Sequence, residues 1–157
     1  MIGKIDVTYP LNYHYFAMTD HVIYDGNCNL CVTLVQLLES LDQGQQFQYI
    51  SMQDQGGLSQ FGLTSTDCEL GMILIDGDNP TRRWQGSDAA EEIGKRLPGG
   101  DIFVTAYQTL PGLKWMGDRI YEQIRDHRYT IFGQRSSTYQ SAYPSCSRCN
   151  QGEGETR

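Results

Sequence analysis

The sequence predicts an α/β fold in which a small mixed sheet is covered by helices. Short segments rich in strand-forming residues alternate with segments whose apolar residues recur at helical spacing, and turn-forming residues separate them. The chain has 157 residues, a length that suits one domain with a core large enough to need no disulfide staples.

The first strand–turn–helix unit surrounds Cys28 and Cys31. Residues 21–24 have strand propensity, and Asp25-Gly26-Asn27 is a turn-forming triplet. Apolar residues then recur at the spacing of one helix face, which predicts a helix over about 29–42. Cys28 is therefore expected at a helix N-terminus, with Cys31 one turn further along the same face.

This placement favours thiol–disulfide exchange, because the thiolate is the reactive form of cysteine. Unpaired backbone N–H groups and the helix dipole stabilise a negative charge at the first turn. Such sites lower a cysteine pKa from about 8.5 into the range of roughly 3.5–7.5. We expect Cys28 to attack a partner disulfide and Cys31 to resolve the mixed disulfide. Two alternatives stay open: half of a zinc site, and a pair of inert core thiols.

The elements that follow complete an ordered core. They are a strand at 47–52, a short helix within 54–62, a strand at 71–76, its hairpin partner at 81–84, and a helix from 87 to about 97. Ser87 or Asp88 is the expected cap of the last helix, and Asp88 and Glu91 have capping-box spacing. The order β-α-β-α-β-β-α is that of a thioredoxin-like fold with a central mixed sheet. It places the Cys-x-x-Cys at the end of the first strand, where open α/β sheets carry their functional sites.

The flanking segments predict additions to this core. Pro111-Gly112 separates two expected helices, over 102–110 and 113–128, and residues 129–133 are a candidate docking segment. Polar and small residues dominate from Gln134 onward. The predicted organisation is an aromatic N-terminal arm at 1–20 with His14 on its surface, a domain at 21–133 with a helical extension from about residue 101, and a flexible tail at 134–157.

Charge and hydropathy exclude several classes of partner. A net charge of −7 without a basic stripe argues against nucleic acid or an anionic membrane as the main partner. The longest apolar run, residues 72–75, is too short to cross a membrane. The first residues lack a signal-peptide pattern, so we expect a cytoplasmic protein. In a reducing compartment, a Cys-x-x-Cys is more often catalytic or metal-binding than a permanent disulfide.

The segment Asp25-Gly26-Asn27-Cys28-Asn29-Leu30-Cys31 resembles the D-x-x-C-x-x-C signature of the DCC family of thiol-disulfide oxidoreductases. Further similar landmarks are Gly86-Ser87-Asp88-Ala89, Leu97-Pro98-Gly99 and the segment 128–133, so the resemblance covers about residues 21–135. It implies a thioredoxin-like fold and dithiol/disulfide exchange at Cys28 and Cys31. The expected substrate is a disulfide on a protein or a small molecule, and no organic cofactor or metal is required.

Asp25 completes the signature and has two compatible interpretations. Its carboxylate is a candidate general base for Cys31 during resolution, and its charge would raise the pKa of Cys28. It is equally a candidate for an Asx turn or helix cap. In contrast to thioredoxins, residues 66–71 contain no proline before the third strand, so substrate docking is expected to differ.

The other cysteines leave a second class of function open. Cys146 and Cys149 form another Cys-x-x-Cys, interpreted as an internal electron relay, as part of a four-cysteine zinc site, or as a separate or incidental pair. Cys68 is expected to be a small buried apolar residue. The alternative to an enzyme is a binding or redox-sensing module, with zinc on the Cys-x-x-Cys pairs and a protein partner at the N-terminal arm or the tail.

Overall fold

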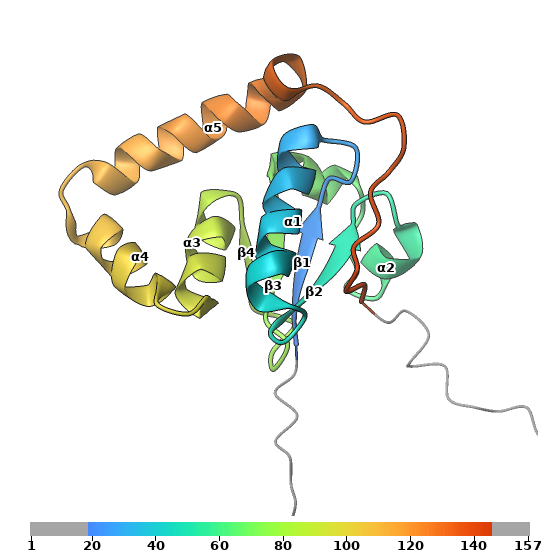
Figure 1. Cartoon of the computed structure of the whole chain (residues 1–157), viewed down its shortest axis with the longest axis horizontal. Helices are drawn as coiled ribbons and strands as arrows, with labels where there is room; N and C mark the ends of the chain where they lie inside the picture. Colours follow the sequence, from blue (N-terminus) through green and yellow to red (C-terminus); the bar gives the residue numbers. More distant parts are fainter. Residues whose placement is uncertain (1–18, 146–157) are drawn as a thin grey trace, which may run out of the picture.

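A computed structural model describes residues 19–145, which form a four-stranded mixed sheet surrounded by helices (Figure 1). The strands are β1 (Asp20–Tyr24), β2 (Phe47–Ser51), β3 (Ile73–Ile75) and β4 (Arg83–Gln85). Their order in the sheet is β2-β1-β3-β4, with β1 parallel to β2 and antiparallel to β3, and β3 antiparallel to β4. This topology confirms the predicted α/β fold with a thioredoxin-like core.

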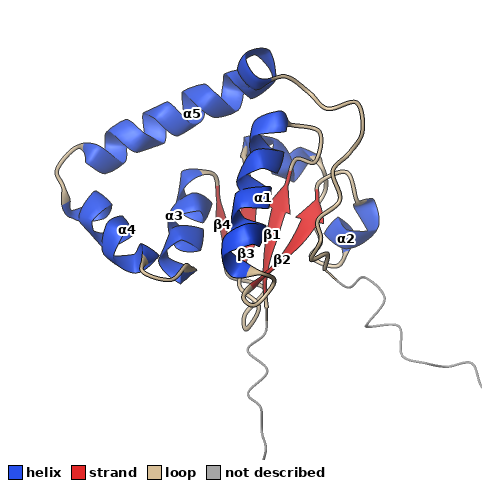
Figure 2. Ribbon diagram, viewed as in Figure 1, coloured by secondary structure: helices blue, strands red, loops and turns tan. Residues whose placement is uncertain are grey.

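Helices lie on both sides of the sheet and continue into an extension (Figure 2). They are α1 (Asn29–Asp42), α2 (Gln55–Ser59), the short 3-10 helix η1 (Thr66–Leu70), α3 (Ser87–Arg96), α4 (Gly100–Thr109) and α5 (Leu113–Phe132). Helix α1 has the predicted bounds. Helix α5 is longer than predicted and takes up most of the candidate docking segment. Gly86 is the N-cap residue of α3, and no side chain caps this helix, so the predicted caps at Ser87 or Asp88 are wrong.

The core consists of two apolar clusters, one on each face of the sheet. Alternation along β1 sends Val22 and Tyr24 to the face with α1 and α3, and Ile23 to the face with α2 and η1. Each large apolar side chain that is fully buried stabilises the fold by about 1.5–3 kcal/mol. Cys68 belongs to the second cluster and is 5 % exposed, which confirms its predicted burial.

Residues 134–145, the first part of the predicted tail, return to the sheet and pack against it. The Tyr49 N–H donates to the Tyr143 carbonyl at 3.0 Å, and the Ser145 N–H donates to the Tyr49 carbonyl at 3.2 Å. The Tyr139 hydroxyl donates to the buried Glu39 carboxylate at 2.8 Å, and Tyr139 and Tyr143 pack on the first apolar cluster. Local polarity predicted a tail, but these aromatic rings supply apolar surface that the core buries. The rest of the predicted tail and of the N-terminal arm lies outside the described residues.

The extension brings α5 back to the beginning of α1. Lys114, near the start of α5, lies 2.7 Å from a carboxylate oxygen of Glu91 and 3.2 Å from one of Asp88, which ties α5 to α3. The other end of α5 lies beside the N-terminal end of α1 (Figure 1). Within residues 19–145, no helix combines the length and the apolar composition needed to cross a membrane.

Candidate dithiol site

Cys28 and Cys31 lie where the β1–α1 turn enters α1. Cys28 is the N-cap residue, with φ −90° and ψ 120°, and its Sγ accepts a hydrogen bond from the Cys31 N–H at 3.3 Å. N-cap side chains normally satisfy such a free N–H with an oxygen, and here a sulfur takes that place. Both thiols are free. The expected positions, at the helix N-terminus and one turn along, are both observed.

The two thiols differ strongly in acidity. The hydrogen bond from the Cys31 thiol, together with the Cys31 N–H and the positive charge of Arg128, lowers the pKa of Cys28 to about 6, against opposing effects of burial and of Asp25. The same bond to Cys28, with burial, raises the pKa of Cys31. At neutral pH the pair therefore carries one proton, which is on Cys31, and Cys28 is the thiolate. This is the expected order of acidity.

The more acidic thiol, Cys28, is the less accessible of the two. Cys28 is 0 % exposed, whereas Cys31 is only half-buried. Residues 133–135, which we call the strap, run antiparallel beside the Cys28 turn, where Cys28 and Gln134 form an isolated bridge. The Asn29 N–H donates to the Gly133 carbonyl at 3.3 Å, and the Arg135 N–H donates to the Asn27 carbonyl at 2.8 Å. The acidic sulfur is thus enclosed and the less acidic one is reachable.

Asp25 is buried under the turn and accepts hydrogen bonds from four groups. Its Oδ1 accepts from the Asn27 N–H at 3.0 Å and from Gln53 Nε2 at 2.9 Å. Its Oδ2 accepts from Arg128 Nη2 at 3.4 Å and from the Tyr129 hydroxyl. The Asn27 bond is the Asx turn that was one of the two interpretations of Asp25. The four donors keep the carboxylate in a fixed orientation beside the dithiol.

Sequence reasoning missed Gln53, Arg128 and Tyr129 as parts of this site. Arg128 and Tyr129 stood only in a segment that served as a family landmark, and Gln53 carried no signal. Arg128 and Asp25 form an ion pair whose side chains are 11 % and 4 % exposed. A pair so far from water is screened much less than a surface pair. It brings the positive charge of α5 to the β1–α1 turn.

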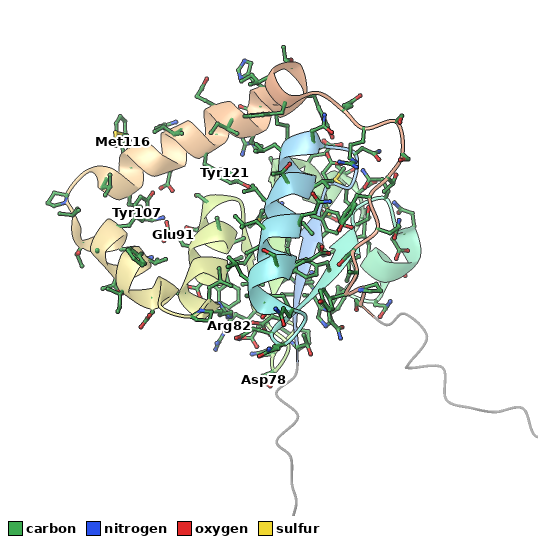
Figure 3. All side chains as sticks on the ribbon, viewed as in Figure 1. Asp78, Arg82, Glu91, Tyr107, Met116 and Tyr121 are labelled. Atoms are coloured by element: carbon green, nitrogen blue, oxygen red, sulfur yellow. The ribbon has the colours of Figure 1, made fainter. Side chains whose placement is uncertain are left out.

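A cavity of about 290 Å³ opens beside Cys31, between α1, the η1–β3 connection and α5. Its walls are mostly apolar and include Cys31, Leu34, Cys68, Met72, Tyr121 and Ile124. Tyr121 extends from α5 toward the core (Figure 3). Gly71 has a φ of +119°, and a Cβ there would lie 3.1 Å from the Gly86 Cα and 2.6 Å from the Tyr121 hydroxyl, so any other residue would be strained at this position. Cys28 is not part of the cavity wall.

The metal alternative depends on residues outside the described range. Among residues 19–145, no group of three or more His, Cys, Asp or Glu side chains is arranged to hold a metal ion. Two thiolates alone do not complete the tetrahedral set of a structural zinc site. Cys146 and Cys149, which would be needed for the four-cysteine site, lie beyond the described residues.

Comparisons with known proteins identify the family of the chain. An uncharacterized protein of Bacillus subtilis (strain 168), YuxK, is 27% identical over 118 residues, which cover 73% of this chain and 82% of that protein. No solved structure shows significant similarity to the chain. The DCC1-like thiol-disulfide oxidoreductase family matches residues 22–134, from β1 to the strap. The chain therefore belongs to the DCC1-like thiol-disulfide oxidoreductase family.

Proposed function

We propose that this protein exchanges thiols and disulfides through Cys28 and Cys31, which alternate between a dithiol and a disulfide. One observation carries the proposal: Cys28 Sγ caps α1 and accepts the Cys31 N–H at 3.3 Å. A thiolate in this place is stabilised by the helix N-terminus, and its partner thiol is one turn away, within reach for a disulfide. The reaction needs no organic cofactor or metal, because the electrons move between sulfur atoms.

Asp25 has two parts in the proposed reaction. Its carboxylate holds the turn through the Asn27 N–H and Gln53, which keeps Cys28 at the cap position. Its charge raises the pKa of both thiols. Asp25 and Cys31 line the same cavity, and in this proposal the carboxylate accepts the Cys31 proton when that thiol enters the exchange.

The substrate in this proposal is a disulfide or the corresponding thiol, on a protein or a small molecule. The family name supports this class of substrate and specifies no individual compound. A cytoplasmic location and a protein partner at the N-terminal arm or the tail stay predictions.

The direct test is a redox titration of the full-length protein. Protein equilibrated at a series of thiol/disulfide ratios is alkylated and analysed by mass spectrometry. We expect a reversible two-electron couple confined to Cys28 and Cys31, unchanged when Cys146 and Cys149 are both replaced by Ser. Cys68→Ser is the matched control, because Cys68 is also buried near the site but has no cysteine one turn away. Absence of a couple in the wild-type protein would refute the proposal.

The complete burial of Cys28 favours one alternative, a non-catalytic redox-sensing or zinc-binding module. In that case the dithiol is oxidised or metallated without turning over a substrate. Metal analysis of protein purified without chelator, combined with turnover of a small disulfide, separates the two functions. Stoichiometric zinc that is lost in Cys28→Ser and in Cys146→Ser would support the module.

A further inference from the structure

We propose that the cavity beside Cys31 binds a small apolar dithiol, and that the substrate becomes covalently attached to Cys31 while Cys28 is the leaving sulfur. This inference rests on the proposed function and deepens it by naming the class of substrate and the sulfur that it meets. It also exchanges the roles that the sequence hypothesis gave to the two cysteines.

Access to the sulfur atoms is the first argument. Cys28 is 0 % exposed beside the strap, whereas Cys31 is half-buried and lines the cavity. Thiol–disulfide exchange requires the attacking sulfur to reach the attacked sulfur, so access decides which atom forms the new bond. In the described structure, a molecule in the cavity meets Cys31 and not Cys28.

The chemistry of the cavity walls is the second argument. Leu34 of α1, Met72 beside β3 and Ile124 of α5 present apolar side chains next to Cys31. The two arginines that also line the cavity are paired with carboxylates: Arg128 with Asp25 and Arg125 with Asp126. An apolar body is therefore favoured over a charged one. The volume of about 290 Å³ lies just below the range of roughly 300–1,000 Å³ for small-molecule sites, which favours a compact ligand.

The reaction follows from these positions and balances in atoms and electrons. In the oxidised protein, one substrate thiolate attacks Cys31 Sγ, the Cys28–Cys31 bond breaks, and Cys28 leaves as a thiolate. The second thiol of the substrate then attacks the substrate sulfur that is bonded to Cys31 in the mixed disulfide. This closes the substrate disulfide and releases Cys31, which takes up a proton. The substrate dithiol loses two electrons and two protons and becomes a cyclic disulfide; one proton ends on Cys31, and the other passes to solvent when the attacking substrate thiol ionises, because Cys28 stays a thiolate. The protein disulfide is reduced, and the reverse exchange with another disulfide regenerates it.

The leaving sulfur is well placed for this direction. An acidic thiol leaves faster than an ordinary one, and Cys28 departs into the N-cap position, where the Cys31 N–H is directed at its sulfur. Stabilising the reduced form also makes a disulfide a stronger oxidant. The structure thus favours oxidation of the substrate dithiol by the protein, without the buried Cys28 having to meet the substrate.

The first test locates the covalent bond. Full-length Cys28→Ser and Cys31→Ser proteins, both also carrying Cys146→Ser and Cys149→Ser, are treated with 2,2′-dithiodipyridine, an apolar disulfide. Release of pyridinethione gives the rate, and peptide mass spectrometry separates Cys68 from the site. We expect Cys31 in the first protein to react at least about tenfold faster than Cys28 in the second, a difference of about 1.4 kcal/mol in barrier. Equal rates, or faster reaction at Cys28, would overturn the proposal.

The second test examines the cavity with matched variants. Oxidised protein is reduced by dihydrolipoamide, an apolar dithiol, or by dithiothreitol, a hydrophilic one. Ile124→Asp and Leu34→Asp place a charge on the cavity wall. Ile120→Asp and Leu37→Asp place it on the same helices at exposed positions that do not line the cavity. We expect the cavity variants to slow dihydrolipoamide about tenfold or more relative to dithiothreitol, because an apolar ligand in the cavity would have to displace water from the new charge.

The outcomes separate this inference from the proposed function. Equal effects on the two dithiols, or equal effects of cavity and control variants, would refute the apolar site while the redox couple of the wild-type protein survives. Circular dichroism identifies any variant that fails to fold. For such a position, Ile124→Asn and Leu34→Asn take the place of the charged variants under the same criterion. Loss of the couple itself would instead refute the proposed function.

Discussion

Arg128 Nη2, near the end of α5, lies 3.4 Å from Oδ2 of Asp25, in the turn before α1, and both side chains are almost fully buried. The two residues are 103 positions apart in the chain. Asp25 also accepts hydrogen bonds from Gln53, which lies on a further segment, and from Tyr129, which follows Arg128 on α5. The helical extension is therefore structurally part of the dithiol site, because it supplies the counter-charge of the signature aspartate.

Replacing Arg128 tests this pairing. Arg128→Ala leaves a buried carboxylate without its counter-charge, and breaking such a pair costs about 3–5 kcal/mol of unfolding free energy. The same change removes a positive charge that lowers the pKa of Cys28, so that pKa is expected to rise. Urea denaturation followed by circular dichroism measures the first effect, and titration of Cys28 measures the second.

Arg125→Ala is the matched control for that variant. Arg125 is on the same helix and pairs at 2.8 Å with the exposed Asp126. Surface pairs contribute about 0–1 kcal/mol, so little stability should be lost. A similar loss of unfolding free energy from both replacements would show that the Arg128–Asp25 pair stabilises the fold no more than a surface pair does.

The acidity of Cys28 predicts a pH titration in the neutral range. The ultraviolet absorbance of thiolate in the reduced protein should rise with pH, with a midpoint near the pKa of about 6. Below this pH Cys28 is protonated, and above it the thiolate persists. Cys28→Ser should lack this transition. Cys31→Ala should move the midpoint upward, because it removes the hydrogen bond from the Cys31 thiol, which is the largest cause of the lowered pKa. An unchanged midpoint in Cys31→Ala would contradict this origin.

Glu39 anchors residues 139–142 to α1. Its carboxylate accepts hydrogen bonds from the Tyr139 hydroxyl at 2.8 Å, the Ser141 hydroxyl and the Ala142 N–H at 3.2 Å. Glu39→Ala leaves these groups without their acceptor and should cost about 1–3 kcal/mol. Hydrogen exchange at the Ser145 and Tyr49 amides should become faster, because the sheet contact of this segment depends on the anchor. Ser40→Ala, at an exposed neighbouring position, should change neither quantity.

The strap predicts that Cys28 can be made more reactive by a substitution outside the two cysteines. Asn29 Nδ2 donates to the Phe132 carbonyl at 2.8 Å, which holds the end of α5 against the start of α1. Asn29→Ala removes this bond, worth about 1 kcal/mol, and should increase alkylation of Cys28 about fivefold in a Cys31→Ser background. Thr33→Ala, which removes an exposed bond one turn further along α1, is the control. If the strap does not shield Cys28, Asn29→Ala will leave its alkylation rate unchanged.

The local features of the site were predictable from the sequence because they arise from neighbouring residues. Turn chemistry at Asp25-Gly26-Asn27 and the apolar period of α1 placed Cys28 at the helix entrance and Cys31 one turn later. The order of strands and helices was sufficient for the sheet topology, since short connections and a parallel crossover leave few arrangements. Boundaries such as the start of β3 and the end of α5 were less well predicted, because pairing partners and packing decide them.

The sequence by itself determined which sulfur is acidic, since that property follows from position at a helix N-terminus and from a thiol one turn away. Only the tertiary structure decided which sulfur is reachable. The strap beside Cys28, the cavity beside Cys31 and the Arg128–Asp25 pair all join segments about a hundred residues apart. Burial depends on how distant elements pack, and no local period or motif encodes it, so acidity and accessibility were assigned to different cysteines only once the fold was known.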